Sequence, residues 1–422
     1  MRILLIGAGG VGAAAVSIAA RRDFFDTMVV ADRDPARAAR AVSALGRGRT
    51  GAGGTGAAGG TAAGGGDPRF VAAGALDASS AEAVTALCRE HRITHVLNAV
   101  DPRFVMPIFN GAYAAGADYL DMAMSLSTPH PDRPHAECGV KLGDAQFAAA
   151  ADWAAAGRLA LVGIGVEPGL SDVFARYAAD HLFSSIDQIG VRDGANLTVD
   201  GYDFAPSFSI WTTIEECLNP PVIWEADRGW YTTAPFSEPE VFDFPDGIGP
   251  VECVNVEHEE VLLIPRWVPA KRVTFKYGLG AEFIDVLKTL HKLGLDSTRP
   301  VSVGGVQVAP RDVVAACLPD PATLGDRMRG RTCAGTWVTG LSPTGEPLEV
   351  YLYHVVDNEW SVAEYGHQAV VWQTALNPVV ALELLAAGTW SGTGVLGPEA
   401  LPAKPFLDLL TAYGSPWGLR TS

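Results

Sequence analysis

The amino-acid sequence predicts a protein of the α/β class, in which a doubly wound parallel sheet is followed by a second domain of α+β structure. Three observations lead to this prediction. Short apolar runs alternate with Ala-rich helical stretches through the first third of the chain, which is typical of a parallel sheet covered on both faces. The stretch GAGGVG separates the first apolar run from the first helical stretch. Near Leu182 the pattern changes to longer β-rich segments.

The first domain is predicted to cover residues 1–165. Its apolar runs have the length and composition of buried strands, and they read RILLIG, TMVVAD, RFVAAG, THVLNAV, DYLDM and RLALVGIG. Helices are expected from about Val11 and from Pro35, where Ala-rich sequence follows the first and second runs. Residues 46–67 have no bulky apolar side chain and no hydrophobic period, so they are predicted to be a flexible Gly/Ala-rich insertion.

Residues 166–375 are predicted to form the second domain, an α+β domain that carries a mixed or antiparallel sheet. The segments expected to be strands read FSSIDQIGVRDGANLTVDGYDFAPSFSIW, EEVLLIPRW, RVTFKYG, TWVTGL and LEVYLYHVV. Helices are expected at about 281–293 and 311–317. Residues 376–422 have a helical pattern and are expected to pack back on the first domain.

Composition restricts the function. Of the 422 residues, 48% are hydrophobic and 19% are charged, which is a globular balance. The formal net charge of −17 repels phosphate backbones and anionic membranes, so we expect no nucleic-acid partner, no membrane partner and a small-molecule substrate. No apolar run reaches the about 18 residues of a membrane span. Gly7 to Gly12 interrupt the first apolar stretch, unlike a signal peptide, so we expect a soluble cytoplasmic protein.

The cysteines do not suggest a metal site. All six are widely scattered, without the short spacings that bring two thiolates to one metal, so we expect reduced thiols. His130, His135 and Cys138 stand close together in TPHPDRPHAECG, but a polar Pro-rich loop explains this composition as well as a metal does. The sequence therefore predicts no metal.

The glycine motif predicts dinucleotide binding. Gly7, Gly9 and Gly12 lie directly after an apolar strand and directly before a helix, where a tight turn, a close pyrophosphate and close helix packing each require a missing side chain. The backbone N–H groups of Gly10 and Val11 at the helix start are expected to face the phosphates.

An acidic residue follows at the expected distance. Asp32 ends the second predicted strand about 20 residues after the motif, where a carboxylate accepts hydrogen bonds from the adenine ribose. This carboxylate favours NAD because it repels a ribose 2′-phosphate. The adjacent Arg33 can stack on adenine or bind that phosphate, so NADP remains possible.

Further cofactor contacts are expected at the carboxyl ends of the third and fourth strands. Asn98, Ala99 and Val100 end the fourth strand, where the ribose and nicotinamide of a dinucleotide should lie. Asp77 follows the third strand and is expected to face the adenine. All of these residues can equally be polar or turn residues that cap strand ends.

Five segments resemble the saccharopine dehydrogenase family, in its saccharopine-reductase-like branch. In chain order they read LLIGAGGVG, VLNAVDPRFVMPIFNGAYAAGADYLDMA, GIGVEPGLSDVFA, FKYGLGAEFIDVLKTLHKLGL and GTWSGTGVLGPEAL. The first is similar to the cofactor loop of the family, and the others are similar in order and spacing to its later segments.

The resemblance implies a homodimeric NAD(P)-dependent oxidoreductase, with a Rossmann domain and a catalytic domain that also forms the dimer. The implied reaction is hydride transfer at a carbon–nitrogen bond, as in making or cleaving an N-substituted amino acid such as saccharopine. A lysine 6-dehydrogenase or a carboxynorspermidine-type polyamine enzyme is an alternative on the same scaffold. A second alternative is a protein that binds NAD(H) without catalysis, because a fold does not by itself establish chemistry.

Carboxylates near the expected crevice are candidates for the acid or base. Glu167 in GVEPG follows an apolar strand, so burial can raise its pKa, but it can also cap the helix expected near Leu170. The family usually carries Asp at this place, and Glu is one methylene longer. Asp121 is a second catalytic candidate, or a strand-end acid that binds backbone. Asp101 is a candidate substrate contact.

Substrate contacts are expected in the second domain. Lys276 in TFKYG aligns with an Arg of the family and is a candidate clamp for a substrate carboxylate, although Lys offers only a point charge and is often solvated. Trp211 and His258 belong to a stretch where aromatic and acidic residues alternate. Such a stretch can line a pocket for an amine or polyamine, or it can fill a core or dimer interface.

Overall fold

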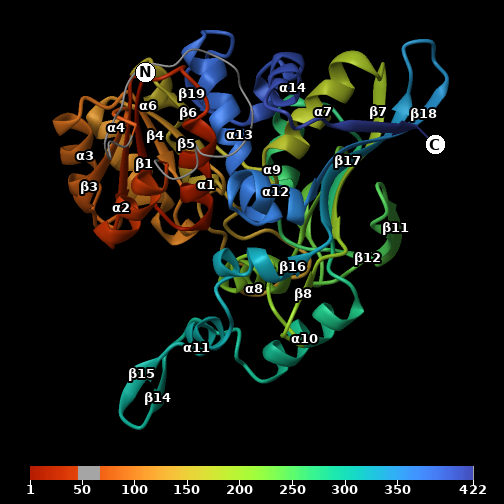
Figure 1. Ribbon diagram of the computed structural model, residues 1–422. Coiled ribbons are helices and arrows are strands. Elements are labelled where there is room, and N and C mark those ends of the chain that lie inside the picture. Colours follow the sequence, from red (N-terminus) through yellow and green to blue (C-terminus); the bar gives the residue numbers. More distant parts are fainter. Residues whose placement is uncertain (46–66, 422) are drawn as a thin grey trace.

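The computed structural model describes residues 1–45 and 67–421. Figure 1 shows two layered bodies side by side, the first built around the sheet that contains the N-terminus and the second around a long curved sheet. The predicted insertion at 46–67 lies, except for Asp67, outside the described residues.

The first body is a doubly wound parallel sheet. Its strand order is β19-β6-β5-β4-β1-β2-β3, and every pairing in it is parallel. The strands are β1 (Arg2–Ile6), β2 (Thr27–Asp32), β3 (Phe70–Ala75), β4 (His95–Asn98), β5 (Asp118–Asp121), β6 (Leu159–Leu161) and β19 (Gly394–Leu396). The helices are α1 (Gly10–Ala19), α2 (Pro35–Ala44), α3 (Ala81–Glu90), α4 (Val105–Ala115), α5 (Asp144–Ala148) and α6 (Ala150–Ala155). The predicted Rossmann-type fold is confirmed.

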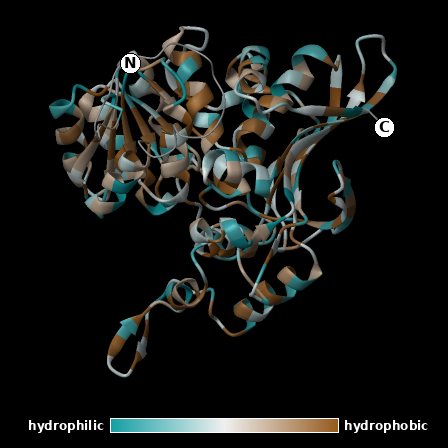
Figure 2. Cartoon of the chain, in the orientation of Figure 1, coloured by the Kyte–Doolittle hydropathy of each residue, from teal (hydrophilic) through white to brown (hydrophobic). Residues whose placement is uncertain are grey.

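Burial explains why these strands read as continuous apolar runs. Residues 3–6 of β1 and 28–31 of β2 are at most 1% exposed, because helices cover both faces of the sheet. Figure 2 shows the apolar strands of this sheet enclosed by helices whose outer faces are polar. The strand order reverses between β1 and β4, and a doubly wound sheet binds ligands beyond the carboxyl ends of the strands at such a point.

The second body contains a mixed sheet. Its main order is β10-β9-β13-β7-β17-β18-β20, with the β11–β12 hairpin added beside β13, and the β13–β7 pair is parallel while the other pairs are antiparallel. The strands are β7 (Ser185–Ala195), β9 (Val222–Glu225), β10 (Gly229–Thr232), β11 (Glu240–Phe244), β12 (Gly249–Asn255), β13 (Arg272–Gly278), β17 (Arg331–Leu341), β18 (Pro347–Asp357) and β20 (Gly418–Thr421). Two small sheets pair β8 (Thr198–Val199) with β16 (Met328–Arg329) and β14 (Val301–Val303) with β15 (Val306–Val308).

Helices pack around and beside this sheet. They are α7 (Leu170–His181), α8 (Ile210–Leu218), α9 (Glu260–Trp267), α10 (Ala281–Lys292), α11 (Pro310–Cys317), α12 (Asn358–Tyr365), α13 (Ala369–Ala386) and α14 (Ala403–Ala412), with 3₁₀ turns η1 (Pro102–Phe104), η2 (Pro321–Thr323), η3 (Gly325–Arg327) and η4 (Pro398–Ala400). Helix α8 begins where an extended segment was expected, and the side chain of Ser209 caps it by accepting from the backbone N–H of Thr212.

The expectation of a strand at EEVLLIPRW was wrong, because this segment forms helix α9. Residues 261–264 are four consecutive apolar residues and all are 0% exposed. A short segment that is apolar on every side has no hydrophobic period, so the sequence pattern cannot separate a buried helix from a buried strand. The correction matters for the site, since α9 places two consecutive glutamates beside His258.

The C-terminal segment divides between the two sheets. Helix α13 packs on α1 and β19 pairs with β6, in agreement with the expectation that this segment returns to the first domain. Strand β20 instead pairs with β18 of the second sheet, so packing on the first domain alone is too simple a description. Helix α13 is long and apolar enough to cross a membrane, but 78% of it is buried inside the protein, as in a core helix.

Candidate active site

The loop between β1 and α1 has the shape of a dinucleotide cradle. Gly7 has a φ of +101°, and a Cβ on Gly12 would lie 1.8 Å from the carbonyl oxygen of Gly7, so neither position accepts a side chain without rearrangement. A Cβ on Gly9 would meet no atom within 4 Å. Gly9 therefore borders open space at the start of α1, where the pyrophosphate of a dinucleotide approaches the backbone.

Asp32 holds this loop in place. Its Oδ2 accepts from the backbone N–H of Ala8 at 2.8 Å, and its Oδ1 accepts from that of Asp34 at 2.8 Å. The carboxylate is thus fixed at the edge of the cradle, and each oxygen keeps a second acceptor site for a ribose hydroxyl. The residues around the glycine loop fit an NAD(P) dinucleotide.

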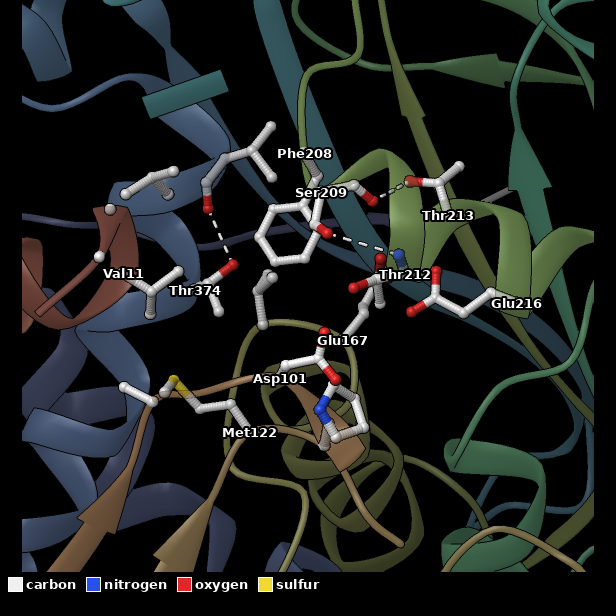
Figure 3. A pocket seen from close by; sticks show the side chains of 18 of the residues that line it. Val11, Asp101, Met122, Glu167, Phe208, Ser209, Thr212, Thr213, Glu216 and Thr374 are labelled. Carbon is white, nitrogen blue, oxygen red and sulfur yellow. Dashed lines mark hydrogen bonds between the residues drawn. The ribbon is translucent and has the colours of Figure 1, made fainter. Parts of the chain in front are cut away.

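A cavity of about 320 Å³ extends from this cradle toward the second sheet. On the cradle side it is lined by Gly9, Gly10, Val11, Asn98, Ala99 and Val100. On the other side it is lined by residues of the second body, among them Glu167, Asp193, Glu216, His258, Glu259 and Tyr277. Figure 3 shows Val11, Asp101, Glu167 and Glu216 among the side chains that line it.

Charge in this cavity is strongly one-sided. Seven of its lining side chains are carboxylic, namely Asp101, Asp121, Glu167, Asp193, Glu216, Glu259 and Asp320. Among the described residues that line it, none is Lys or Arg, and His258 is the one side chain able to become a cation near neutral pH. The cavity is therefore built to receive positive charge.

Glu167 and Asp193 form a carboxyl pair in this cavity. The two carboxyl groups lie close enough to shift each other's pKa, and Oε1 of Glu167 is buried without a hydrogen-bond partner. Burial, together with the charge of Asp193, raises the pKa of Glu167 well above its ordinary value. Burial also raises the pKa of Asp193, to about 6. Of the two carboxyl groups, Glu167 is therefore the one more readily protonated.

His258 lies at the centre of the remaining carboxylates. Its Nδ1 is 2.5 Å from Oε2 of Glu260 and 3.4 Å from an oxygen of Glu259, and its ring stacks on Phe275 with centroids 3.8 Å apart. Burial by itself would lower the pKa of His258, but the charges of Glu260, Glu259 and Glu216 outweigh burial and raise it to about 10. We therefore expect an imidazolium ion at neutral pH.

The same group has the spacing of a metal site. The ligand atoms of His258, Glu259 and Glu260 lie within 4.8 Å of one another. The Nδ1 of His258, however, is already paired with Glu260.

Family models match almost the whole chain. The model of the saccharopine dehydrogenase NADP binding domain matches residues 3–161, and that of the saccharopine dehydrogenase C-terminal domain matches residues 165–415. The chain belongs to the saccharopine dehydrogenase family.

Relatives and a solved structure agree with this assignment. The carboxynorspermidine synthase of Vibrio cholerae serotype O1 is 30% identical over 419 residues, which cover 99% of this chain and 96% of the relative. The carboxyaminopropylagmatine dehydrogenase of Synechocystis is 27% identical over 417 residues, with 99% and 96% coverage. The solved structure of saccharopine dehydrogenase (L-Glu forming) from Saccharomyces cerevisiae superposes with a TM-score of 0.68 at 14% identity. The match covers 100% of this chain and 99% of that chain, so the two share a fold.

The resemblance found in the sequence is thereby confirmed. This member of the saccharopine dehydrogenase family is an NAD(P)-dependent oxidoreductase acting at carbon–nitrogen bonds. The roles of individual residues in its site remain predictions, but the structure shows which candidates lie together. Glu167, Asp121, Asp101 and His258 line one cavity with the predicted cofactor residues Gly9 to Val11 and Asn98 to Val100.

Asp121 lies in the cavity wall but is fully engaged with protein. Its Oδ2 accepts from the hydroxyl of Tyr119 at 2.9 Å and the amide of Gln146 at 2.8 Å, and its Oδ1 accepts from the backbone N–H of Gly163 at 2.7 Å. Tyr119 in turn accepts from the amide of Asn98 at 2.9 Å. Burial raises the pKa of Asp121 to about 7. This network favours the alternative in which Asp121 braces the ends of β4, β5 and β6.

Glu167 does not cap α7. The backbone N–H of Gly169 donates to Asp172 at 2.7 Å, so the first turn of this helix has another carboxylate. The side chain of Glu167 lines the cavity instead, which removes the capping alternative.

Lys276 lies away from the cavity, contrary to its expected role as a carboxylate clamp. Its Nζ is 2.6 Å from Oε2 of Glu240, which also pairs with Arg192. On β13, side chains alternate between the two faces of the sheet, and Tyr277 faces the cavity while Lys276 faces the β11–β12 hairpin. Among the described residues that line the cavity, no Lys or Arg takes the place of the expected carboxylate clamp.

Trp211 also lies outside the cavity lining. The guanidinium carbons of Arg103 and Arg311 lie over its ring, at 4.4 and 4.7 Å from the ring centroid. Asp101 lines the cavity and accepts from Nε of Arg103 at 2.8 Å. Trp211 thus contacts Arg103, the arginine that binds the cavity residue Asp101.

Five predicted cofactor residues do not line the cavity: Gly7, Gly12 and Asp32 belong to the glycine loop and its edge, and the other two are Arg33 and Asp77. Arg33 and Asp77 are exposed, and neither lines it. Asp77 accepts from the backbone N–H of Ser79 at 2.9 Å and from its hydroxyl at 2.6 Å, and these bonds, with a smaller effect of Arg33, lower the pKa of Asp77. This arrangement is the turn cap that was the alternative for Asp77.

Several acidic residues of the site were not found from the sequence. Asp193 lies on β7, and the sequence did not show which face of the sheet its side chain occupies. Glu259 and Glu260 were expected on a strand, but this segment forms the start of α9. Glu216 was noticed only as part of an acidic and aromatic stretch. A helical reading of residues 259–267 would have kept both glutamates next to His258.

Proposed function

We propose that this enzyme transfers hydride at the carbon–nitrogen bond of a substrate that binds as a cationic amine. The observation that carries the proposal is the cavity beside the dinucleotide cradle. Seven carboxyl side chains line it, and no Lys or Arg does among the residues that the structure describes. A substrate with several carboxylates, such as saccharopine, would meet like charge there, whereas ammonium groups would be stabilised.

The relatives support an amine as the substrate. Two of them are named for carboxynorspermidine and carboxyaminopropylagmatine, and both cover nearly the whole of this chain. The acidic cavity supplies a physical reason for the same preference. The polyamine-type alternative drawn from the sequence is thus the better supported of the two readings.

NAD(P)H supplies the hydride when it is bound, and the cradle residues from Gly9 to Val11 would hold its pyrophosphate. Asn98, Ala99 and Val100 would hold the part of the cofactor nearest to the substrate. Asp32, fixed by two backbone N–H groups, would accept from the ribose hydroxyls and repel a 2′-phosphate, so we propose NAD as the preferred form.

Glu167 is the proposed acid and base. As an acid it gives its proton to the substrate nitrogen when a C=N bond is reduced, so that hydride at carbon and proton at nitrogen together form the amine. In the opposite direction it takes that proton back. Asp193, the neighbouring carboxyl with the lower pKa, stabilises the cationic nitrogen as a carboxylate. The homodimer and the cytoplasmic location expected from the sequence remain predictions.

The test is a matrix of reactions followed by NADH and NADPH absorbance near neutral pH. Mono-, di- and polyamines and amino acids are each combined with small carbonyl compounds, including an ω-aldehyde of an acidic amino acid. We expect oxidation of NADH with amines, at a rate that exceeds that of glutamate with aminoadipate semialdehyde. Preference for the latter pair, or for substrates with two or more carboxylates, would contradict the proposal.

A further inference from the structure

The side chain of Glu216 lines the cavity from the inner face of α8. Ser209, Thr212, Thr213 and Glu216 line the cavity together, as residues three or four apart on one helical face do. The neighbouring Glu215 points elsewhere and pairs with Arg311. No hydrogen bond or ion pair to the side chain of Glu216 is found among the described residues, although this side chain stands in a densely acidic site.

The surroundings of Glu216 keep it protonated when no ligand is bound. Burial raises the pKa of Glu216 to about 8, and Glu259, Glu260 and Asp193 add to this, while His258 acts in the opposite direction. One imidazolium ion is thus shared among several carboxyl groups and already contacts Glu260. A cation arriving next to Glu216 would reverse the balance, because it stabilises the carboxylate form.

Glu167 and Glu216 come from different segments that line the cavity. Glu167 lies on the segment between β6 and α7, and Glu216 lies on α8. If Glu167 serves the reacting nitrogen, Glu216 is available to a different part of the same substrate. We propose that Glu216 binds a second cationic nitrogen of the substrate, other than the reacting one, and releases its proton into solution when that nitrogen binds.

This inference rests on the proposed function and adds a specificity residue to it. Binding is tested by titration calorimetry on the full chain with bound NAD⁺ at pH 7, using α,ω-diaminoalkanes of three to six carbons and the 1-aminoalkanes of equal length. Each titration is run in phosphate and in Tris, because the difference in heat between the two buffers gives the number of protons released. The variants are Glu216→Gln, Glu216→Asp and Glu282→Gln, in which the last changes an exposed glutamate of α10.

For the unmodified enzyme we expect the best diamine to bind at least about 10-fold more tightly than its monoamine, with about one proton released per diamine. Glu216→Gln should weaken diamine binding about 10- to 100-fold, remove the proton release and leave monoamine binding within about two-fold. Glu216→Asp should retain proton release and shift the preference toward a longer diamine, because its side chain is one methylene shorter. Glu282→Gln should behave as the unmodified enzyme.

The outcomes separate the two proposals. If amines bind but Glu216→Gln weakens diamine and monoamine equally, or leaves proton release intact, the role of Glu216 is wrong and the amine substrate stands. If no amine binds and the reaction matrix shows no amine-dependent NADH oxidation, the proposed function fails and the role of Glu216 fails with it. Unchanged NADH affinity and an unchanged circular dichroism spectrum show that the variants are folded.

Discussion

His258 Nδ1 lies 2.5 Å from Oε2 of Glu260, inside a buried group of carboxyl side chains. Ser171 donates to the other oxygen of Glu260 at 2.9 Å, so α7, α9 and the segment before α9 meet at this ion pair. The imidazolium offsets the repulsion of Glu259 as well. A single cation therefore stabilises the acidic wall of the cavity.

Loss of this cation is expected to destabilise the fold. His258→Asn should lower the free energy of unfolding by roughly 3 kcal/mol, because removing one partner leaves a buried charge unpaired. Urea unfolding followed by Trp fluorescence measures this change. His135→Asn, at an exposed histidine, is the matched control and should have little effect. Equal stability of the two variants would show that His258 is not the buried cation.

Stability should fall as the pH rises above neutrality. The folded-state pKa of His258 is raised to about 10, so its stabilisation is present in full below its usual value of 6.5 and is lost as the pH rises through 10. The raised pKa values of Glu216, about 8, and Glu257, about 7, act in the same direction, because the folded protein binds more protons than the unfolded chain. Thermal unfolding without ligand should give a lower Tm at pH 8.5 than at pH 5.5, and the opposite order would refute this account.

The substitution Glu167→Gln tests the proposed role of Glu167 as the acid and base of the reaction. The amide cannot exchange a proton, so kcat for the substrate pair found in the reaction matrix should fall about 10²- to 10⁴-fold. The Kd of NADH, measured by fluorescence quenching, should remain within about two-fold, because Glu167 lies across the cavity from the cradle. Activity equal to that of Glu282→Gln would remove Glu167 from the chemistry.

Lys276→Met separates stability from catalysis. The substitution removes the ion pair with Glu240, and the free energy of unfolding should fall by roughly 1–3 kcal/mol. Because Lys276 does not line the cavity, kcat and KM should stay within about two-fold of the unmodified values. A large rise in KM with unchanged stability would instead return Lys276 to the substrate site.

Two glycine substitutions test the cradle. The Cβ that Gly9→Ala adds has no protein atom within 4 Å, so the Tm of this variant should be unchanged. The new methyl group should weaken NADH binding at least about 10-fold. Gly12→Ala places its Cβ 1.8 Å from the carbonyl oxygen of Gly7, so it should lower the Tm of the protein without cofactor. Calorimetric titration and thermal unfolding measure both quantities. Unweakened NADH binding by Gly9→Ala would place the pyrophosphate elsewhere.

Local sequence determined much of this protein. The glycine loop, Asp32 and the order of apolar runs predicted the dinucleotide fold, because the backbone requirements of a turn and of a strand buried on both faces involve only nearby residues. The family resemblance led to the correct reaction class. Glu167 and His258 were also selected from the sequence, and both lie in the cavity.

The tertiary structure decided which charges share one space. Asp193 reaches the cavity through the facing direction of β7, Glu216 through the inward face of α8, and Lys276 is turned away by the alternation of β13. Facing direction depends on the register of strands distant in sequence, and a shift of one residue reverses it. For this reason the sequence by itself predicted a cationic clamp, and only the packed sheet showed that the cavity wall is acidic.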